Sequence, residues 1–119
     1  MRASQVPSIK RSQKESLLYK ELSRLFLELI LDDARLIGIT LTRAGLSQDK
    51  GVCSVFFYCP GGMDEFKQKL GILILYRPSL RKALATVAPS RYTPELVFKF
   101  DTQFEKQQRI DQLLERIKE

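Results

Sequence analysis

The sequence predicts a single α+β domain, and three observations carry this prediction. The chain has 119 residues, the length of one ordinary domain. Hydrophobic residues make up 44% of it, enough to build a core and more than a disordered chain would contain. Segments with apolar residues every three or four positions alternate with segments in which every second residue is apolar, so both helices and strands are expected.

The first predicted element is a helix from Ser12 to about Leu31. Ser12 and Glu15 have the spacing of a capping box, in which each side chain satisfies a free backbone N–H of the other residue. The apolar stripe of this helix consists of Leu18, Leu22, Leu25, Phe26, Leu29 and Ile30. Residues 1–11 show no periodicity and are predicted to form a flexible basic arm, leaving residues 12–119 as the domain.

Three strands are predicted from alternating patterns. The first covers residues 36–44, with Ile37, Ile39 and Leu41 on one face. The second covers residues 52–59, and the short loop between the two predicts an antiparallel hairpin. The third follows Pro94, where Leu96, Phe98 and Phe100 alternate with Val97 and Lys99.

Two further helices are predicted before the third strand and one after it. The first runs from about Asp64 to Tyr76, and Pro78 suits the first turn of a new helix, so the pair should kink near Arg77. In the last helix, Thr102 and Glu105 have capping-box spacing. Its stripe consists of Ile110, Leu113, Leu114 and Ile117. The predicted order is α-β-β-α-kink-α-β-α, with a three-stranded sheet packed against helices.

The charge is concentrated in one part of the chain. The formal net charge is +6, and residues 66–91 contain six basic residues and no acidic one. These are Lys67, Lys69, Arg77, Arg81, Lys82 and Arg91. A basic segment between balanced segments is typical of a nucleic-acid footprint, although a solvated helix face has the same composition.

The sequence argues against catalysis and against a metal or cofactor site. It contains no histidine, which is the commonest general base and the commonest metal ligand. Cys53 and Cys59 lie six residues apart in one predicted strand, or about 20 Å, which is too far for a disulfide. We therefore expect two reduced, buried cysteines. The chain also lacks an apolar run of the ~20 residues that a membrane span requires.

The order of elements resembles a type II KH domain, and several motifs resemble the ribosome-binding factor A family. Asp33-Ala34-Arg35-Leu36 looks like the Asp-Pro-Arg-Leu motif of the family, and residues 46–50 resemble its Val-Ser-Lys-Asp-Leu turn. Residues 92–98 are similar to its Val-Pro-Glu-Leu-x-Phe strand. Residues 101–117 resemble its closing helix, with the core Arg-Ile-Asp-x-Leu-Leu. The resemblance extends from about residue 10 to residue 118.

This resemblance implies a cytoplasmic, non-catalytic protein, monomeric when free, that binds the immature small ribosomal subunit and its rRNA. It further implies a role in late maturation and rRNA end processing. The family replaces the Gly-x-x-Gly loop of ordinary KH domains with an Ala-x-Gly kink. Here the aligned residues are Tyr76-Arg77-Pro78, without a glycine. Loss of Gly-x-x-Gly argues against ordinary KH recognition of single-stranded bases.

Three functions are compatible with these residues. The first is RNA binding through phosphate contacts by the basic residues of segment 66–91, assisted by Arg43, Lys10 and Arg11. Tyr76 and Tyr92 would stack on a base or pack in the fold. The second is a protein-interaction adaptor that uses the last helix and does not bind RNA directly. The third is an RNA-processing enzyme, which could use only unplaced carboxylates such as Asp49 and Glu95, and both fit turn or strand-entry roles better.

Overall fold

The computed structural model describes the backbone of residues 2–87 and 93–118, and the side chains of residues 10–86 and 93–118. Its elements follow the order α1 (Arg2–Asp32), the 3-10 turn η1 (Ala34–Leu36), β1 (Thr40–Leu46), β2 (Val52–Tyr58), α2 (Gly62–Val87), β3 (Glu95–Phe100) and α3 (Thr102–Lys118). The predicted α+β class is confirmed. No helix in the described ranges is both long and apolar enough to cross a bilayer.

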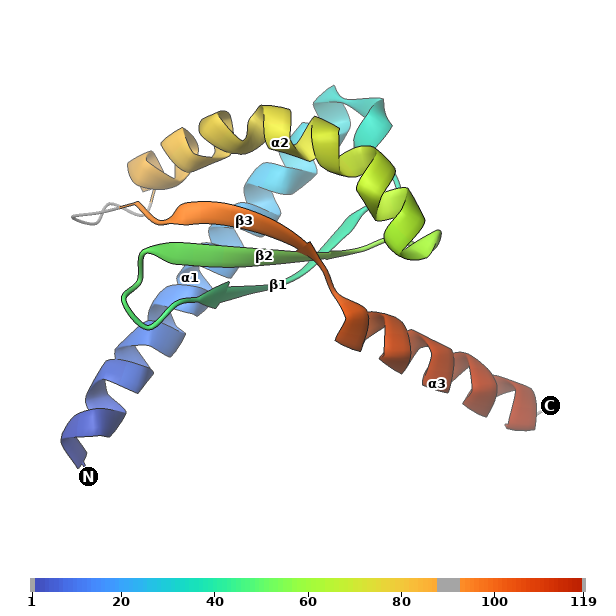
Figure 1. Cartoon of the computed structure of the whole chain (residues 1–119), viewed down its shortest axis with the longest axis horizontal. Helices are drawn as coiled ribbons and strands as arrows, with labels where there is room; N and C mark the ends of the chain where they lie inside the picture. Colours follow the sequence, from blue (N-terminus) through green and yellow to red (C-terminus); the bar gives the residue numbers. More distant parts are fainter. Residues whose placement is uncertain (1, 88–92, 119) are drawn as a thin grey trace.

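The sheet is mixed, and α1 and α2 both pack on the same face of it. Its order is β1-β2-β3, with β1 antiparallel to β2 and β2 parallel to β3. Figure 1 shows α1 crossing behind the strands and α2 arching along the β3 side. A parallel pair needs a long crossover connection, which α2 supplies. The opposite face of the sheet, called the open face below, is covered only where α3 begins.

Phe57 is at the centre of the core. It is 1% exposed, and its ring centroid lies 5.1 Å from that of Phe26 on α1, 6.3 Å from that of Phe66 on α2 and 5.6 Å from that of Phe98 on β3. Every second residue of β2 and β3 is buried, as the alternating pattern predicted. The aromatic contacts thus join both helices to the sheet, and pairs of this kind stabilise a core beyond their buried area.

The predicted start of the first helix is wrong. The helix α1 begins at Arg2, so Ser12 lies inside it and accepts a hydrogen bond from the Ser16 hydroxyl through its carbonyl. Glu15 does not complete a capping box. Its carboxylate instead accepts the backbone N–H of Leu46 at 2.6 Å. That N–H belongs to the edge strand β1. A hydrogen bond between α1 and β1 cannot be predicted from the spacing of residues within a helix. The separate role of residues 1–11 stays a prediction.

A hydrogen-bonded turn after α1 displaces the first strand. The carboxylate of Asp33 accepts a hydrogen bond from the backbone N–H of Arg35 at 3.0 Å and two more from the Arg35 guanidinium. It also accepts the Tyr76 hydroxyl at 2.5 Å. Residues 34–36 therefore form η1, and Ile37 is 60% exposed rather than part of a strand. The prediction for residues 36–44 is corrected to β1, Thr40–Leu46. The hairpin itself is confirmed.

The two helices predicted on either side of Pro78 are one helix. Pro78 lies inside α2, where it has no N–H to donate to the carbonyl of Ile74. Leu73, Leu80 and Leu84 are buried on both sides of it, so packing on the core offsets a proline cost of about 3 kcal/mol. Figure 1 shows α2 bending partway along its length. The predicted change of direction is present, without a break in the helix.

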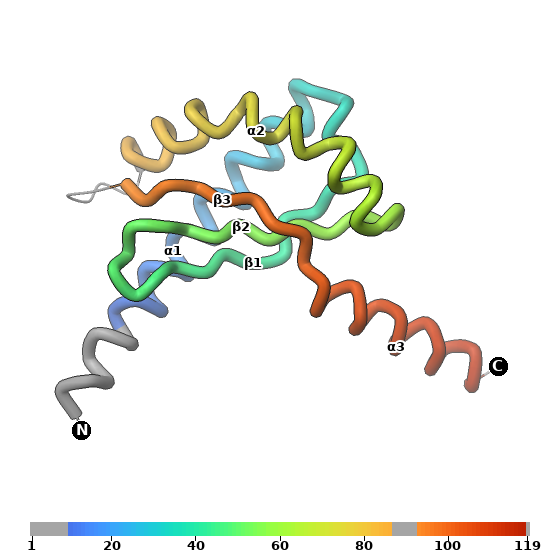
Figure 2. The backbone as a smooth tube through the Cα atoms, in the orientation of Figure 1, coloured from blue at the N-terminus to red at the C-terminus, as the bar shows by residue number. Residues whose placement is uncertain are grey.

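The last helix is capped by a different residue and does not enter the core. Asp101, not Thr102, caps it, because the Asp101 carboxylate accepts the N–H of Phe104 at 3.0 Å. Figure 2 shows α3 leading away from the sheet. Its predicted core stripe is 50–78% exposed, in contrast to the expectation that all helices share one core. The stripe residues are Ile110, Leu113, Leu114 and Ile117. Only the first turn packs, through Phe104 on Tyr58 with ring centroids 4.9 Å apart.

The two cysteines are free and buried, as predicted. Cys53 and Cys59 are both 0% exposed. Burial raises the pKa of each thiol to about 11, because the thiolate would lose its hydration. Near neutral pH both are therefore protonated and inert.

We expect neither thiol to react with Ellman's reagent in the native protein at pH 7.5, and both to react in denaturant without a reducing agent. Mass spectrometry of the native monomer should give the mass of the fully reduced chain. A mass two daltons lower would mean an internal disulfide and would contradict the placement of both residues on β2 and its end.

A second prediction concerns acid stability. Hydrogen bonds from Arg35, and then from Tyr76, hold the pKa of Asp33 well below its usual range. A carboxylate whose pKa is lower in the native state stabilises the fold at pH values above the pKa of an unfolded aspartate, about 3.9. This stability is lost as the pH falls toward the pKa of Asp33 in the native protein. We expect Asp33→Asn to be less stable than the parent at pH 7 in urea unfolding. The difference should shrink between pH 5 and pH 2.

The control is Asp64→Asn, whose carboxylate is exposed and has no hydrogen-bond partner among the described residues. It should change the free energy of unfolding at pH 7 far less than Asp33→Asn does. An Asp33→Asn variant with the parent's profile would contradict the assigned role of this carboxylate.

Candidate nucleic-acid interface

Two lysines of the predicted footprint lie free on the outer face of α2. Lys67 and Lys82 are exposed, and neither ammonium group has a hydrogen-bond or ion-pair partner among the described residues. They are 15 positions apart, about 22 Å along a helix. Gly71 and Pro78 lie between them on the same exposed side of the helix. This face can receive an anionic backbone without first breaking a contact within the protein.

Three other basic residues of the segment are held by the fold. The Lys69 ammonium donates to the Ile37 carbonyl and to the Glu65 carboxylate, both at 2.7 Å. The Arg81 guanidinium donates to the carbonyls of Thr93 and Pro94, at 3.0 and 3.1 Å. Arg77 is half-buried, with its guanidinium carbon 5.3 Å from the centre of the Phe98 ring. These residues therefore help to place β3 and the start of α2.

The remaining predicted residues are distributed over other parts of the molecule. Lys10 and Arg11 lie on α1, the former exposed and the latter half-buried. Arg91 and Tyr92 lie outside the described residues. Tyr76 is half-buried and donates its hydroxyl proton to Asp33, which raises the pKa of the phenol. For Tyr76 the structure thus gives a packing role.

Arg43 is placed on the open face by an irregularity in β1. Leu41 pairs with Phe57 and Arg43 with Phe56, so Thr42 is an extra residue that forms a β-bulge. The Arg43 guanidinium lies 3.9 Å from the centre of the Phe56 ring. Its Nε donates to the Asp101 carboxylate at 3.0 Å, and 47% of the side chain remains exposed. The arginine is therefore both oriented and accessible.

The carboxylate that holds Arg43 is itself buried. Asp101 is 3% exposed, and its Oδ2 also accepts the Thr42 hydroxyl at 2.7 Å. Burial alone would raise the pKa of Asp101, but hydrogen bonds from Thr42, the Phe104 N–H and Arg43 outweigh it, and the pKa is lowered. The carboxylate is thus ionised at neutral pH and fixes the guanidinium in place.

Two residues of the open face were not among the predicted site residues. Phe56 pairs with Arg43 on one side and with Lys99 of β3 on the other, so the three form one row across the sheet. The Lys99 ammonium lies 5.9 Å from the centre of the Phe56 ring. The alternation of β2 and β3 could have put both residues on the outer face. Their alignment in one row depends on the register of the parallel pair β2 and β3, which cannot be read from the periodicity of either strand.

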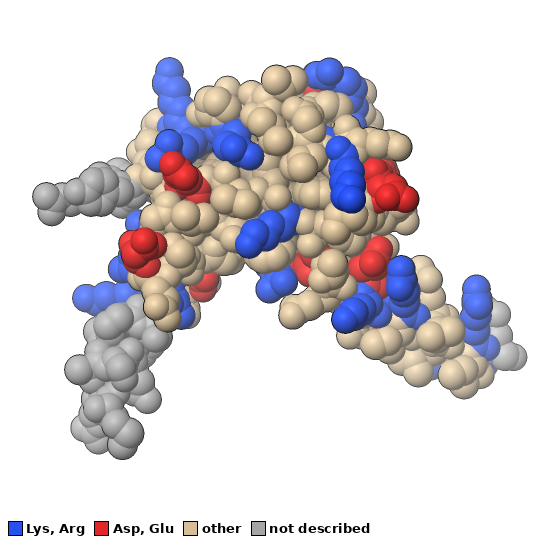
Figure 3. Space-filling model, viewed as in Figure 1, with Lys and Arg blue, Asp and Glu red and all other residues tan. Residues whose placement is uncertain are grey.

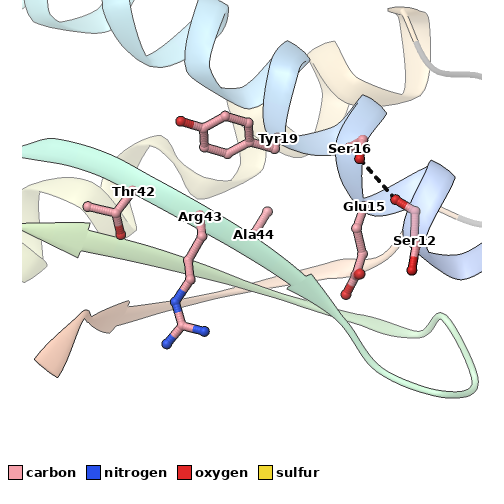
Figure 4. A pocket seen from close by; sticks show the side chains of 7 residues that line it. All are labelled: Ser12, Glu15, Ser16, Tyr19, Thr42, Arg43 and Ala44. Atoms are coloured by element: carbon pink, nitrogen blue, oxygen red, sulfur yellow. Dashed lines mark hydrogen bonds between the residues drawn. The ribbon is translucent and has the colours of Figure 1, made fainter. Parts of the chain in front are cut away.

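A groove follows the free edge of β1. It is lined by Ser12, Glu15, Ser16 and Tyr19 of α1 and by Thr42, Arg43 and Ala44 of β1. Figure 4 shows Arg43 directed to the side of the strand away from Tyr19, so this side chain belongs to the open face. Glu15 occupies the N–H of Leu46 at this edge. That contact limits strand addition by another chain.

The basic side chains do not form one compact patch. Figure 3 shows Lys and Arg side chains spread over the viewed face, including the area over the middle of the sheet. They lie on the outer face of α2, on the open face of the sheet, and on α1 and α3. Within the described part of segment 66–91, Lys67 and Lys82 are free, whereas Lys69, Arg77 and Arg81 are held by the fold.

Comparison with known proteins identifies a family with this architecture. The family model described as "Ribosome-binding factor A" matches residues 10–114. Ribosome-binding factor A of Pelobacter propionicus is 32% identical over 108 residues, covering 91% of this chain and 88% of the relative. The protein of the same name from Halothermothrix orenii is 32% identical over 103 residues, covering 87% and 84%. The crystal structure of ribosome-binding factor A from Thermus thermophilus superimposes with a TM-score of 0.63, at 27% identity, covering 74% of this chain and 92% of that one.

Proposed function

The chain belongs to the ribosome-binding factor A family, and from this membership we propose that it binds the immature small ribosomal subunit and its rRNA. It acts there without catalysis, as a cytoplasmic monomer, and assists late maturation and processing of the rRNA ends. Family membership over residues 10–114 is the observation that carries the proposal. The net charge of +6 supports an RNA partner.

The outer face of α2 is the part of the predicted footprint best suited to phosphates. Lys67 and Lys82 are exposed there and have no partner among the described residues, so they can neutralise phosphates at no cost to the fold. Lys69, Arg77 and Arg81 support this surface from within. Such contacts position an RNA without reading its sequence.

We expect the double variant Lys67→Glu and Lys82→Glu to bind purified immature small subunits at least tenfold more weakly than the parent. Its plot of log affinity against log salt should be shallower by about two, because each lost phosphate contact changes the slope by roughly 0.9. Thermal unfolding should be little altered, since exposed charges contribute little to stability. Filtration or sedimentation with the subunits at several salt concentrations measures both quantities.

The charge-matched control is Lys106→Glu and Lys118→Glu, both exposed on α3. It should retain most of the affinity. Equal losses from the two double variants would mean that net charge drives binding, and the α2 face would be the wrong site.

The exposed stripe of α3 favours a second candidate function, that of a protein-interaction adaptor which does not bind RNA directly. Ile110, Leu113, Leu114 and Ile117 form one apolar face that the rest of the described chain leaves uncovered. An apolar face exposed in this way is typical of an interaction surface. In this case, association with the subunit would survive nuclease treatment and high salt.

Leu113→Ser with Leu114→Ser tests this surface. Because both side chains are more than half exposed, we expect the free energy of unfolding to change by less than about 1 kcal/mol. If α3 carries the interaction, association with the subunit should fall sharply in pull-down experiments. Unchanged association would exclude the adaptor role for this face. A large loss of stability would instead show that the stripe packs within the chain.

A further inference from the structure

We propose that the row Arg43–Phe56–Lys99 on the open face of the sheet is a second RNA site, which stacks an unpaired base and binds its phosphate. This inference rests on the proposed function, because it assumes an RNA partner, but it concerns a surface on the other side of the sheet from α1 and α2. The ligand class is single-stranded RNA with a splayed-out base.

The guanidinium of Arg43 supplies a fixed plane. It lies 3.9 Å from the centre of the Phe56 ring, which is close enough for direct contact over the ring. The Nε of Arg43 donates to the carboxylate of Asp101, which follows β3, at 3.0 Å. Since the side chain is still 47% exposed, part of the guanidinium faces solvent. Unpaired bases stack on arginine planes of this kind as they do on aromatic rings.

Fixing the plane beforehand lowers the entropic cost of binding. A free arginine loses much rotamer freedom when it stacks on a base. Here the bulge at Thr42, the ring of Phe56 and the buried Asp101 already orient the guanidinium. Asp101 also offsets part of its charge, so Arg43 contributes a surface for stacking more than an attraction for phosphate.

Lys99 supplies the charge that the row needs. Its ammonium lies 5.9 Å from the Phe56 ring and has no acidic partner among the described residues. Glu95, the acidic residue on the same face of β3, is four positions away, or about 13 Å along a strand. A base stacked on Arg43 would therefore have its phosphate near an uncompensated cation. The order of cation, ring and cation across three strands is complementary to a nucleotide and not to a neutral peptide.

The space beside the ring is also open. Gly45 precedes Leu46 on β1 and carries no side chain, and a Cβ built on it would lie 3.8 Å from the edge of the Phe56 ring. A larger residue there would pack on the ring from the side. Glycine leaves the ring and the guanidinium accessible to a flat ligand.

The test uses fluorescently labelled octauridylate as the single-stranded probe and an eight-base-pair RNA duplex as its comparison. Arg43→Lys keeps the charge and removes the plane, whereas Phe56→Leu keeps an apolar side chain and removes the ring. We expect each variant to bind the octamer at least fivefold more weakly by fluorescence anisotropy, with little change for the duplex. Lys99→Gln should weaken octamer binding and reduce the salt slope by about 0.7.

The matched control is Arg116→Lys on α3, which should change octamer affinity less than twofold. Normal octamer binding by folded Arg43→Lys and Phe56→Leu would overturn the proposal. If Phe56→Leu fails to fold, Arg43→Lys and a crosslinking experiment decide. A 4-thiouridine octamer should crosslink to peptides that contain Phe56 or Lys99, and crosslinks confined to α2 would refute the site.

The two proposals can fail separately. A parent protein that binds immature subunits but not the octamer would eliminate the stacking site and leave the proposed function standing. A parent that binds the octamer but not the subunits would contradict the proposed function and retain the site.

Discussion

The buried carboxylate of Asp101 joins the sheet, its bulged edge strand and the last helix. One oxygen caps α3 through the N–H of Phe104, and the other accepts Thr42 and Arg43 of β1. A buried carboxylate without hydrogen-bond partners would destabilise the fold by several kcal/mol, so these hydrogen bonds are needed to keep Asp101 buried. One group therefore contacts the start of α3, the bulge residue Thr42 and the guanidinium of Arg43.

Covering only one face of the sheet has a direct consequence for function. The parallel pairing of β2 and β3 requires the crossover helix α2, which packs beside α1 on the same face. Basic residues are thereby divided between two surfaces that point in different directions. The outer face of α2 carries exposed lysines without side-chain partners among the described residues, which suits them to phosphates. The open face carries a fixed guanidinium against a ring, which is suited to a base. In the proposed function, these two surfaces would hold an RNA by two different kinds of contact.

The last helix illustrates a limit of amphipathic patterns. Its stripe has the spacing of a core helix, yet it is exposed because Asp101 caps the helix in a direction that leads away from the sheet. Periodicity shows that a face is apolar but not which surface covers it. On α1 and α2 the covering surface is the sheet. On α3 no other part of the described chain covers this face.

What the sequence determined by itself is local: the helical stripes, the buried sides of β2 and β3, the hairpin, the reduced cysteines and the motifs of the family. Only the tertiary structure decided which side chains far apart in the sequence become hydrogen-bond partners. Glu15 bonds to Leu46 instead of capping its helix, and the side chains of Lys69 and Arg81 donate hydrogen bonds to backbone carbonyls instead of remaining without partners. The row of Arg43, Phe56 and Lys99 exists because of a bulge and a parallel register. Periodicity assigns each side chain a face of its own element, whereas register and hydrogen-bond partners are set only when the elements meet.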